Sequence, residues 1–199
     1  MIHKQISIKD AMKVPKAKEA LDKEWNKLGS TLKAWDLSTV RPRAESQAEA
    51  KRLNIKLHFG NVMDLCHKKH AELALPDPEY KGRVVFRGDQ VRDEAGFYAV
   101  FSEQGTSASH MAAAKFLDAI ARFEGCAGED ADASSAYTQV LLETVGKTLY
   151  TETCVSLPRD RRPKWWDKIA DLVCKLVRNL YGHPLAGLFL SLIHISEPT

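Results

Sequence analysis

The segment KGRVVFRG, residues 81–88, decides the fold class because it is the clearest strand in the sequence. Its centre, VVF, combines β-branched residues with an aromatic one, and such residues favour strands. Alternation along a strand places Lys81, Arg83 and Arg87 on one face, since their positions differ by even numbers. Three cations on one face suit a phosphate or nucleic-acid surface, and an ordinary solvated strand face is an equally good interpretation.

Helices and strands are predicted to alternate on both sides of this segment. Apolar spacing indicates helices over 14–30, 45–75 (with a break at Gly60), 106–125 and 164–181, and extended segments over 34–43 and 148–158. Pro15 suits a first helical turn, Gly29 and Gly125 suit C-terminal caps, and Ser107 or Ser109 suits an N-cap. The interleaved pattern predicts an α+β domain.

The composition is that of one ordinary domain. The chain has 199 residues, of which 44% are hydrophobic, and its net charge of +3 is too small to identify a nucleic-acid partner. Four cysteines lie far apart without a C-x-x-C pair, which favours reduced thiols in an intracellular protein, in the cytoplasm or the nucleus. The longest apolar stretch, LAGLFLSLIHI, is shorter than the roughly 20 residues of a membrane helix, so no membrane partner is expected.

The segment CHKKH is a weak candidate for a metal site. Cys66 and His70 are four residues apart and would share a face of the predicted helix, with His67 adjacent. No second Cys or His cluster offers the remaining ligands at a recognised spacing. A solvated helix turn is therefore the preferred interpretation.

The segment LPRDRRPKWW is a candidate nucleic-acid-binding loop. Cations next to aromatic rings suit nucleic-acid strands, and here they are Arg159, Arg161, Arg162 and Lys164 beside Trp165 and Trp166. The alternative is a basic loop followed by tryptophans that enter the core. For Trp165 and Trp166, this alternative is slightly preferred.

The segment GEDADASSAYTQ, residues 128–139, contains two aspartates, Asp130 and Asp132. A single loop aspartate is usually solvated or caps a helix. A carboxylate metal site needs several oxygen ligands. The segment alone therefore gives little reason to expect a metal.

The order of these segments resembles the reverse transcriptase of copia-type LTR retrotransposons. The family runs from a K-x-R-L-V-x-R-G strand through a Ser-initiated helix and D-V-K-T-A-F to V-C-K-L-x-x-x-L-Y-G-L-K-Q-A. This chain has, in the same order, KGRVVFRG, SASHMAAAKFLDAIA, DASSAYTQ and VCKLVRNLYGHPLAG. AKEALDKEWNKLGSTLKAWDL is similar to the opening helix of the family. The resemblance covers roughly residues 10 to 187.

The resemblance implies RNA-directed DNA synthesis by two-metal nucleotidyl transfer. The pattern D-x-x-x-A-[FY] fits Asp132, which would hold the catalytic Mg²⁺ ions with the Ala133 carbonyl as a further oxygen. Tyr137 falls where the family aromatic excludes a ribose 2′-hydroxyl. Lys81 or Arg83 would grip the triphosphate, and Arg87 extends this nucleotide-binding face.

The partners implied are a template–primer of RNA or DNA, deoxynucleoside triphosphates and the rest of the element's polyprotein. The chain lacks the Y-x-D-D segment that supplies the family's other carboxylates, and Ser134 replaces a basic residue. The usual L-K-Q-A-P is HPLAG, residues 183–187, here. In the family VCKL forms a short strand, which conflicts with the helix that apolar spacing predicts over 164–181.

The expected organisation is therefore a truncated reverse transcriptase domain over 1–190, with fingers and an incomplete palm sheet, inactive by itself. The last residues, SLIHISEPT (191–199), fit no predicted element and resemble a translated sequencing adapter, so we treat them as a non-native tail. One alternative is a non-catalytic, domesticated protein that binds nucleic acid through its basic segments. Another is a helical protein-interaction module.

Overall fold

A six-stranded mixed sheet organises the chain in the computed structural model, which describes residues 2–73, 76, 78–101, 111–129, 134–145 and 150–196. Its strands are β1 (Lys4–Ile6), β2 (Trp35–Pro42), β3 (His58–Lys68), β4 (Tyr80–Phe86), β5 (Thr153–Ser156) and β6 (Leu172–Leu176). The order is β1-β3-β5-β6-β2, and β4 pairs with β3. The β3–β5 pair is parallel and the other pairs are antiparallel. The sheet confirms the α+β class, and it excludes the purely helical module.

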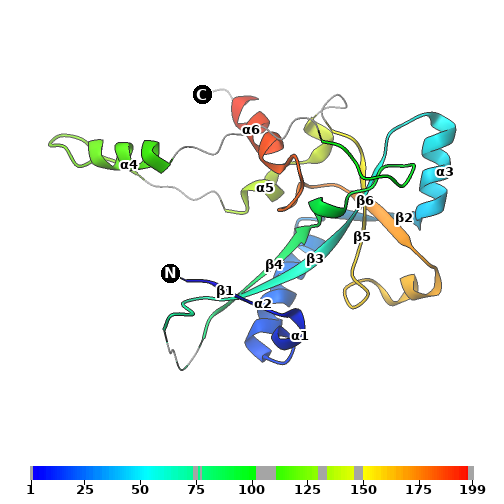
Figure 1. The fold of residues 1–199 in the computed structure, drawn as a ribbon, viewed down its shortest axis with the longest axis horizontal. Helices are drawn as coiled ribbons and strands as arrows, with labels where there is room; N and C mark the ends of the chain where they lie inside the picture. The colour runs from blue at the N-terminus through cyan, green and yellow to red at the C-terminus, as the bar shows by residue number, and fades with distance from the viewer. Residues whose placement is uncertain are drawn as a thin grey trace.

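The long strand β3 joins two halves of the sheet, as Figure 1 shows. Its first part, His58–Asn61, pairs with β5, and its second part, Val62–Lys68, pairs with β4. The strand predicted at KGRVVFRG is therefore confirmed as far as Phe86, where β4 ends. The extended segments predicted over 34–43 and 148–158 are confirmed as β2 and β5.

The helices cover the two halves separately. They are α1 (Ile8–Ala11), α2 (Pro15–Asn26), α3 (Arg43–Leu53), α4 (Met111–Ile120), α5 (Ala136–Gln139) and α6 (Ala186–Ser196). Helices α1 and α2 lie beside β3 and β4, whereas α3 lies at the β2–β6 end (Figure 1). The largest core cluster combines residues from both halves of the sheet and includes Trp25, Trp35, Phe86 and Trp166.

Helix α2 begins with Pro15, as predicted, and buries Leu21 and Trp25. The cap predicted at Gly29 is wrong, because the helix continues as a π-helical turn over Lys27–Thr31. The left-handed residue that follows is Lys33, with φ of 48°.

The helix predicted over 45–75 is wrong beyond its first part. Helix α3 ends at Leu53, and Asn54 adopts a left-handed conformation with φ of 51°. The chain then continues as β3, in which Gly60 is an interior residue. A Cβ on Gly60 would lie 2.3 Å from two carbon atoms of the Phe86 ring, so glycine allows the ring to cross the strand. This close approach is a tertiary feature that helical periodicity does not report.

The helix predicted over 164–181 is also wrong. Lys164–Lys168 forms a 3₁₀ turn, and Leu172–Leu176 forms β6. Four of the five residues of β6 are buried, so the strand is apolar on both faces and lacks alternation. A continuous apolar run is ambiguous between strand and helix. The short strand implied by the family resemblance for VCKL is confirmed.

Helix α4 is shorter than the predicted 106–125 and begins at Met111. The predicted caps Ser107 and Ser109 lie outside the described residues. Phe116 is 66% exposed and Phe123 is exposed as well, so the described part of the chain leaves these two aromatic side chains uncovered. Figure 1 shows α4 at the far left, away from the sheet.

The expectation that 191–199 fit no element is corrected for 191–196, because helix α6 continues through Ser196, and residues 197–199 lie outside the described part of the chain. Phe189 is fully buried in the main core, and Leu190 packs against it. In the part of the chain that the structure describes, no helix is long and apolar enough to cross a bilayer.

Candidate functional site

The candidate site lies where the end of β4 meets the YG pair of residues 181–182. The Phe86 N–H donates a hydrogen bond of 2.8 Å to the Tyr181 carbonyl. A Cβ on Gly182, whose φ is +86°, would lie 2.3 Å from the Phe86 carbonyl oxygen. A Cβ on Gly88 would lie 2.3 Å from the Gly182 carbonyl oxygen. Glycine is therefore required on both sides, and two motifs far apart in sequence form one junction.

The Tyr181 side chain contacts two of the predicted nucleotide-binding residues. The Arg83 guanidinium carbon lies 5.0 Å from the Tyr181 ring centroid, which is a cation–π distance. The Tyr137 and Tyr181 rings meet edge to face, with centroids 4.8 Å apart and planes at 88°. The fold thus brings Arg83 and Tyr137 together through a residue that sequence reasoning missed. Its position beside Gly182, in LYG, is the signal that could have identified it.

The segment that carries Tyr137 is held by several contacts. Ser135 has φ of 58°, and the Lys27 ammonium donates a hydrogen bond to its hydroxyl group. The Arg178 guanidinium donates to the carbonyl groups of Thr138 and Gln139, both at 3.2 Å. These contacts fix α5 against the junction. The predicted metal ligands Asp132 and Ala133 lie outside the described residues.

Lys81 and Arg83 line an open groove of about 840 Å³ between β4 and α2. The groove also carries Lys27 and the acidic residues Asp22 and Glu24. Glu24 is a weak partner for Arg83, with 3.9 Å between carboxylate oxygen and guanidinium nitrogen. Arg83 is therefore the cation that also reaches the tyrosines, while Lys81 lies further along the strand.

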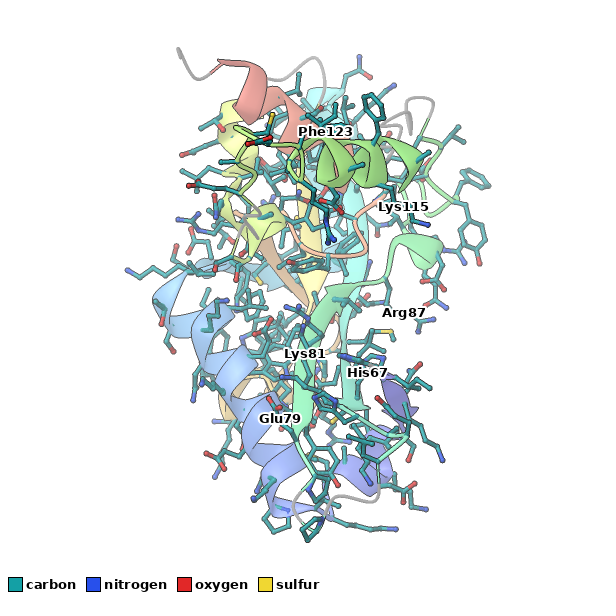
Figure 2. The ribbon with its side chains drawn as sticks, turned by 90° about the vertical axis from the view of Figure 1, so that its left-hand side faces the viewer. His67, Glu79, Lys81, Arg87, Lys115 and Phe123 are labelled. Atoms are coloured by element: carbon teal, nitrogen blue, oxygen red, sulfur yellow. The ribbon has the colours of Figure 1, made fainter. Side chains whose placement is uncertain are left out.

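Arg87 lies beyond the end of β4, so strand alternation does not determine the direction of its side chain. Its guanidinium is 3.2 Å from Asp89, and its Nε is buried without a hydrogen-bond partner among the described residues. Lys81 stands opposite His67 of β3, and Figure 2 shows these two side by side, with Arg87 further along the same face towards α4.

The basic segment 159–164 is largely used for internal contacts. The Arg161 side chain is only 11% exposed, and it forms ion pairs with Asp22, Asp64 and Asp160. Arg162 binds Asp167 through both Nε and Nη2, at 3.0 and 2.6 Å. The guanidinium groups of these two arginines are therefore engaged within the protein.

The remaining residues of this segment are divided between surface and core. Arg159 is 84% exposed and Lys164 is exposed, so these two cations can meet an external partner. Trp166 is fully buried and Trp165 is half exposed. The alternative in which the tryptophans enter the core is confirmed for Trp166.

Asp64 is a buried carboxylate that sequence reasoning missed. It accepts a hydrogen bond from the Trp25 indole N–H and lies 3.5 Å from Arg161 Nε. Burial raises the pKa of Asp64, and the contacts with Trp25 and Arg161 oppose that effect. This carboxylate thus belongs to a clasp between β3, α2 and the segment 159–164.

The CHKKH segment does not form the helical face that was predicted. Cys66 lies in β3 and is buried against α1 and α2, and burial raises the pKa of its thiol. His67 is the next residue of the strand, and His70 lies in a turn with φ of 49°. Across the described ranges, no group of three His, Cys, Asp or Glu side chains could hold a metal ion.

His183, the first residue of HPLAG, is buried in an aromatic cluster next to the junction. Its ring lies 5.1 Å from Phe86, 6.1 Å from Phe101 and 5.3 Å from Phe189, measured between centroids. Burial lowers the pKa of His183 to about 3, so the imidazole is neutral at physiological pH.

No protein-family model matches this chain, and comparisons with curated proteins and with solved structures give no match either.

Proposed function

We propose that the chain is part of a copia-type reverse transcriptase and that the junction forms the nucleotide-binding side of its polymerase site. In this proposal Arg83 binds the triphosphate, with Lys81 as a second cation in the same groove. Tyr137 packs under the sugar. Tyr181 contacts Arg83 and Tyr137 and holds these two side chains in position relative to each other.

One observation carries the proposal. The resemblance assigns Tyr137 to the sugar and Lys81 or Arg83 to the triphosphate of an incoming nucleotide, although 53 residues lie between Arg83 and Tyr137 in the sequence. Both side chains contact the Tyr181 ring. A guanidinium next to aromatic rings at the edge of an open groove is suited to an anionic, ring-containing ligand. The short β6 strand over VCKL is also what the family pattern implies.

The chemistry of the complete enzyme would need Mg²⁺, which supplies a primer 3′-hydroxyl of lowered pKa and charge neutralisation on pyrophosphate. The described residues include no cluster of carboxylates that fits this metal. The 199 residues also contain no Y-x-D-D segment. We therefore assign nucleotide and template–primer binding to these residues, and DNA synthesis to a site with the further carboxylates.

The test is equilibrium binding of a fluorescent deoxynucleoside triphosphate to the full chain with Mg²⁺ and a template–primer duplex. Arg83→Ala should weaken triphosphate binding about tenfold or more, because a hydrogen-bonded charge is lost. Arg83→Lys should retain part of the affinity, since it keeps the charge but loses the planar fork. Arg52→Ala, which removes an arginine of α3 whose side chain is 72% exposed, is the matched control.

Equal triphosphate affinity of the wild type and Arg83→Ala would rule out this site. Salt-dependent duplex binding without any triphosphate binding would instead support the non-catalytic alternative.

A further inference from the structure

A separate pocket, which we call the α3 pocket, lies at the β2–β6 end of the sheet, where α3 begins (Figure 1). It has a volume of about 500 Å³, within the range of pockets that hold small organic groups. Its lining residues are Ser38, Thr39, Val40, Arg41, Ser46, Glu152, Cys154, Val173 and Lys175. None of them belongs to the nucleotide site proposed above.

An irregularity in β2 shapes one wall of the α3 pocket. Asp36 stands opposite Lys175 of β6, and the next residue of β2 that pairs with β6 is Arg41. Residues 37–40 therefore leave the regular ladder, as residues of a bulged strand do. The Thr39 hydroxyl group fixes this segment, because it donates to the Asp36 carbonyl at 2.7 Å and accepts from the Lys175 N–H at 2.9 Å. The wall is thus built before any ligand arrives.

The floor of the α3 pocket contains a buried hydroxyl group, that of Ser46. This residue lies on the face of α3 that also buries Ala50, one turn later, against the sheet. Ser46 is fully buried, and among the described residues its Oγ has no hydrogen-bond partner. Cys154 and Val173, which are buried as well, complete the floor. A buried hydroxyl group without an acceptor costs free energy, so Ser46 indicates a ligand that supplies an acceptor atom.

The first turn of α3 favours a negatively charged ligand at the same place. The first N–H groups of a helix lack partners within the helix and carry a partial positive charge. Pro42 precedes α3, and its side chain caps none of these groups. Glu45, the acidic residue of this turn, is exposed and does not line the pocket. The start of this 11-residue helix and the unpaired Ser46 hydroxyl group therefore both indicate an anion.

Two cations, Arg41 and Lys175, stand at the rim of the α3 pocket, and each has a carboxylate partner. Arg41 pairs with Glu49 of α3, and the Lys175 ammonium lies 3.0 Å from the Glu152 carboxylate. All four side chains are between 37% and 42% exposed, so both ion pairs are open to solvent and weak. A dianionic ligand can therefore compete with the carboxylates for both cations.

We infer that the α3 pocket binds a phosphate group, either as free phosphate or as the phosphate monoester of a small molecule. The oxyanion lies at the start of α3, where the Ser46 hydroxyl group donates to it, and Arg41 and Lys175 neutralise its charge. The pocket is larger than one phosphate group needs, so a small organic part of the ligand fits as well. The inference is independent of the proposed function, because it uses no residue of the junction.

The test is calorimetric titration of the full chain with inorganic phosphate and, separately, with glycerol phosphate, against chloride at equal ionic strength. Ser46→Ala should weaken phosphate binding about threefold to tenfold, and Arg41→Gln and Lys175→Gln about tenfold or more each. Glu152→Gln should strengthen binding about twofold to fivefold, because it releases Lys175 from its carboxylate partner. Lys51→Gln is the matched control, because it removes an exposed cation of the last turn of α3 that does not line the pocket.

Circular dichroism and urea denaturation would establish that each variant is folded. Without phosphate, Ser46→Ala should be at least as stable as the wild type, because it removes an unpaired buried hydroxyl group. Weaker phosphate binding by this variant therefore cannot be attributed to misfolding.

Tighter binding of glycerol phosphate than of inorganic phosphate would identify a phosphorylated small molecule as the ligand, and equal binding would identify phosphate itself. Phosphate binding no stronger than chloride binding would overturn the inference. Phosphate affinity that is unchanged in Ser46→Ala or in Lys175→Gln would overturn it as well, and would assign water as the partner of the buried hydroxyl group.

Discussion

Two basic segments, 81–88 and 159–164, carry the same kind of signal in the sequence, since each places arginine or lysine close to aromatic residues. In the first segment, Arg83 lies 3.9 Å from one carboxylate of the described residues, that of Glu24, and it faces Tyr181 and an open groove. In the second segment, Arg161 is buried and meets three carboxylates. The charge of one arginine is available to a ligand, and that of the other is neutralised within the fold.

The difference arises from residues outside the two segments. Asp22 and Asp64 come from α2 and β3, and they reach Arg161 because the segment 159–164 crosses the ends of these elements. Trp25 lies beside the same arginine, with its ring centroid 5.7 Å from the guanidinium carbon. A basic motif can therefore serve as a binding surface only where the fold leaves its cations weakly paired with carboxylates. Substitutions in the two regions examine this comparison.

The largest effect is expected from Arg161→Ala. Removing the guanidinium would leave Asp64, whose side chain is almost fully buried, without its charged partner, at a cost of ~3–5 kcal/mol in unfolding free energy. Urea denaturation followed by tryptophan fluorescence measures this change. Arg159→Ala, in the same segment, should change stability by less than about 0.5 kcal/mol. Similar stabilities for the two variants would show that Arg161 is not a structural clasp.

The next effect concerns the junction. Gly182→Ala should lower the free energy of unfolding by ~3 kcal/mol, because it combines a left-handed φ with a Cβ placed 2.3 Å from a backbone oxygen. Gly96→Ala separates these causes, since Gly96 has φ of +90° and no atom within 4 Å of an added Cβ. We expect ~1 kcal/mol for Gly96→Ala. A Gly182→Ala variant as stable as Gly96→Ala would contradict the close approach at the junction.

The smallest effect is the pH dependence of the free energy of unfolding that His183, next to the junction, contributes. The pKa of His183 is lowered to about 3 from an ordinary 6.5, so the unfolded chain binds a proton that the folded chain rejects. Stability should therefore fall as pH decreases below 6.5, and His58, whose pKa is also lowered by burial, adds in the same direction. The slope contributed by His183 approaches about 1.4 kcal/mol per pH unit.

His183→Leu should reduce this acid sensitivity, because leucine has no proton to bind. Thermal unfolding of the wild type and the variant between about pH 7 and pH 5 measures the difference. Arg159→Ala, which leaves His58 and His183 in place, should retain the wild-type slope over this range. Identical slopes for wild type and His183→Leu would remove His183 from the explanation.

Local patterns predicted the elements whose signals are local. Pro15 at the start of α2, the VVF run of β4 and the extended segment of β2 all match the structure. The predictions failed where burial on both faces removed the period, as in β6, and where one ring crosses another strand, as Phe86 does at Gly60. For the candidate site, the resemblance named Lys81, Arg83, Arg87 and Tyr137 without choosing between Lys81 and Arg83. Sequence reasoning missed Tyr181 and Asp64, whose contacts come from distant parts of the chain.

The sequence by itself determined the mixed class of the fold, the order of the motifs and the residue types that can bind a phosphate or a base. These properties depend on neighbouring residues and on composition, which the chain carries before it folds. Only the tertiary structure decided that Arg83 meets Tyr181 and that Arg161 meets three aspartates. The physical reason is that a cation's role depends on the distance to its counter-charges and on its exposure to water, and long-range contacts set both.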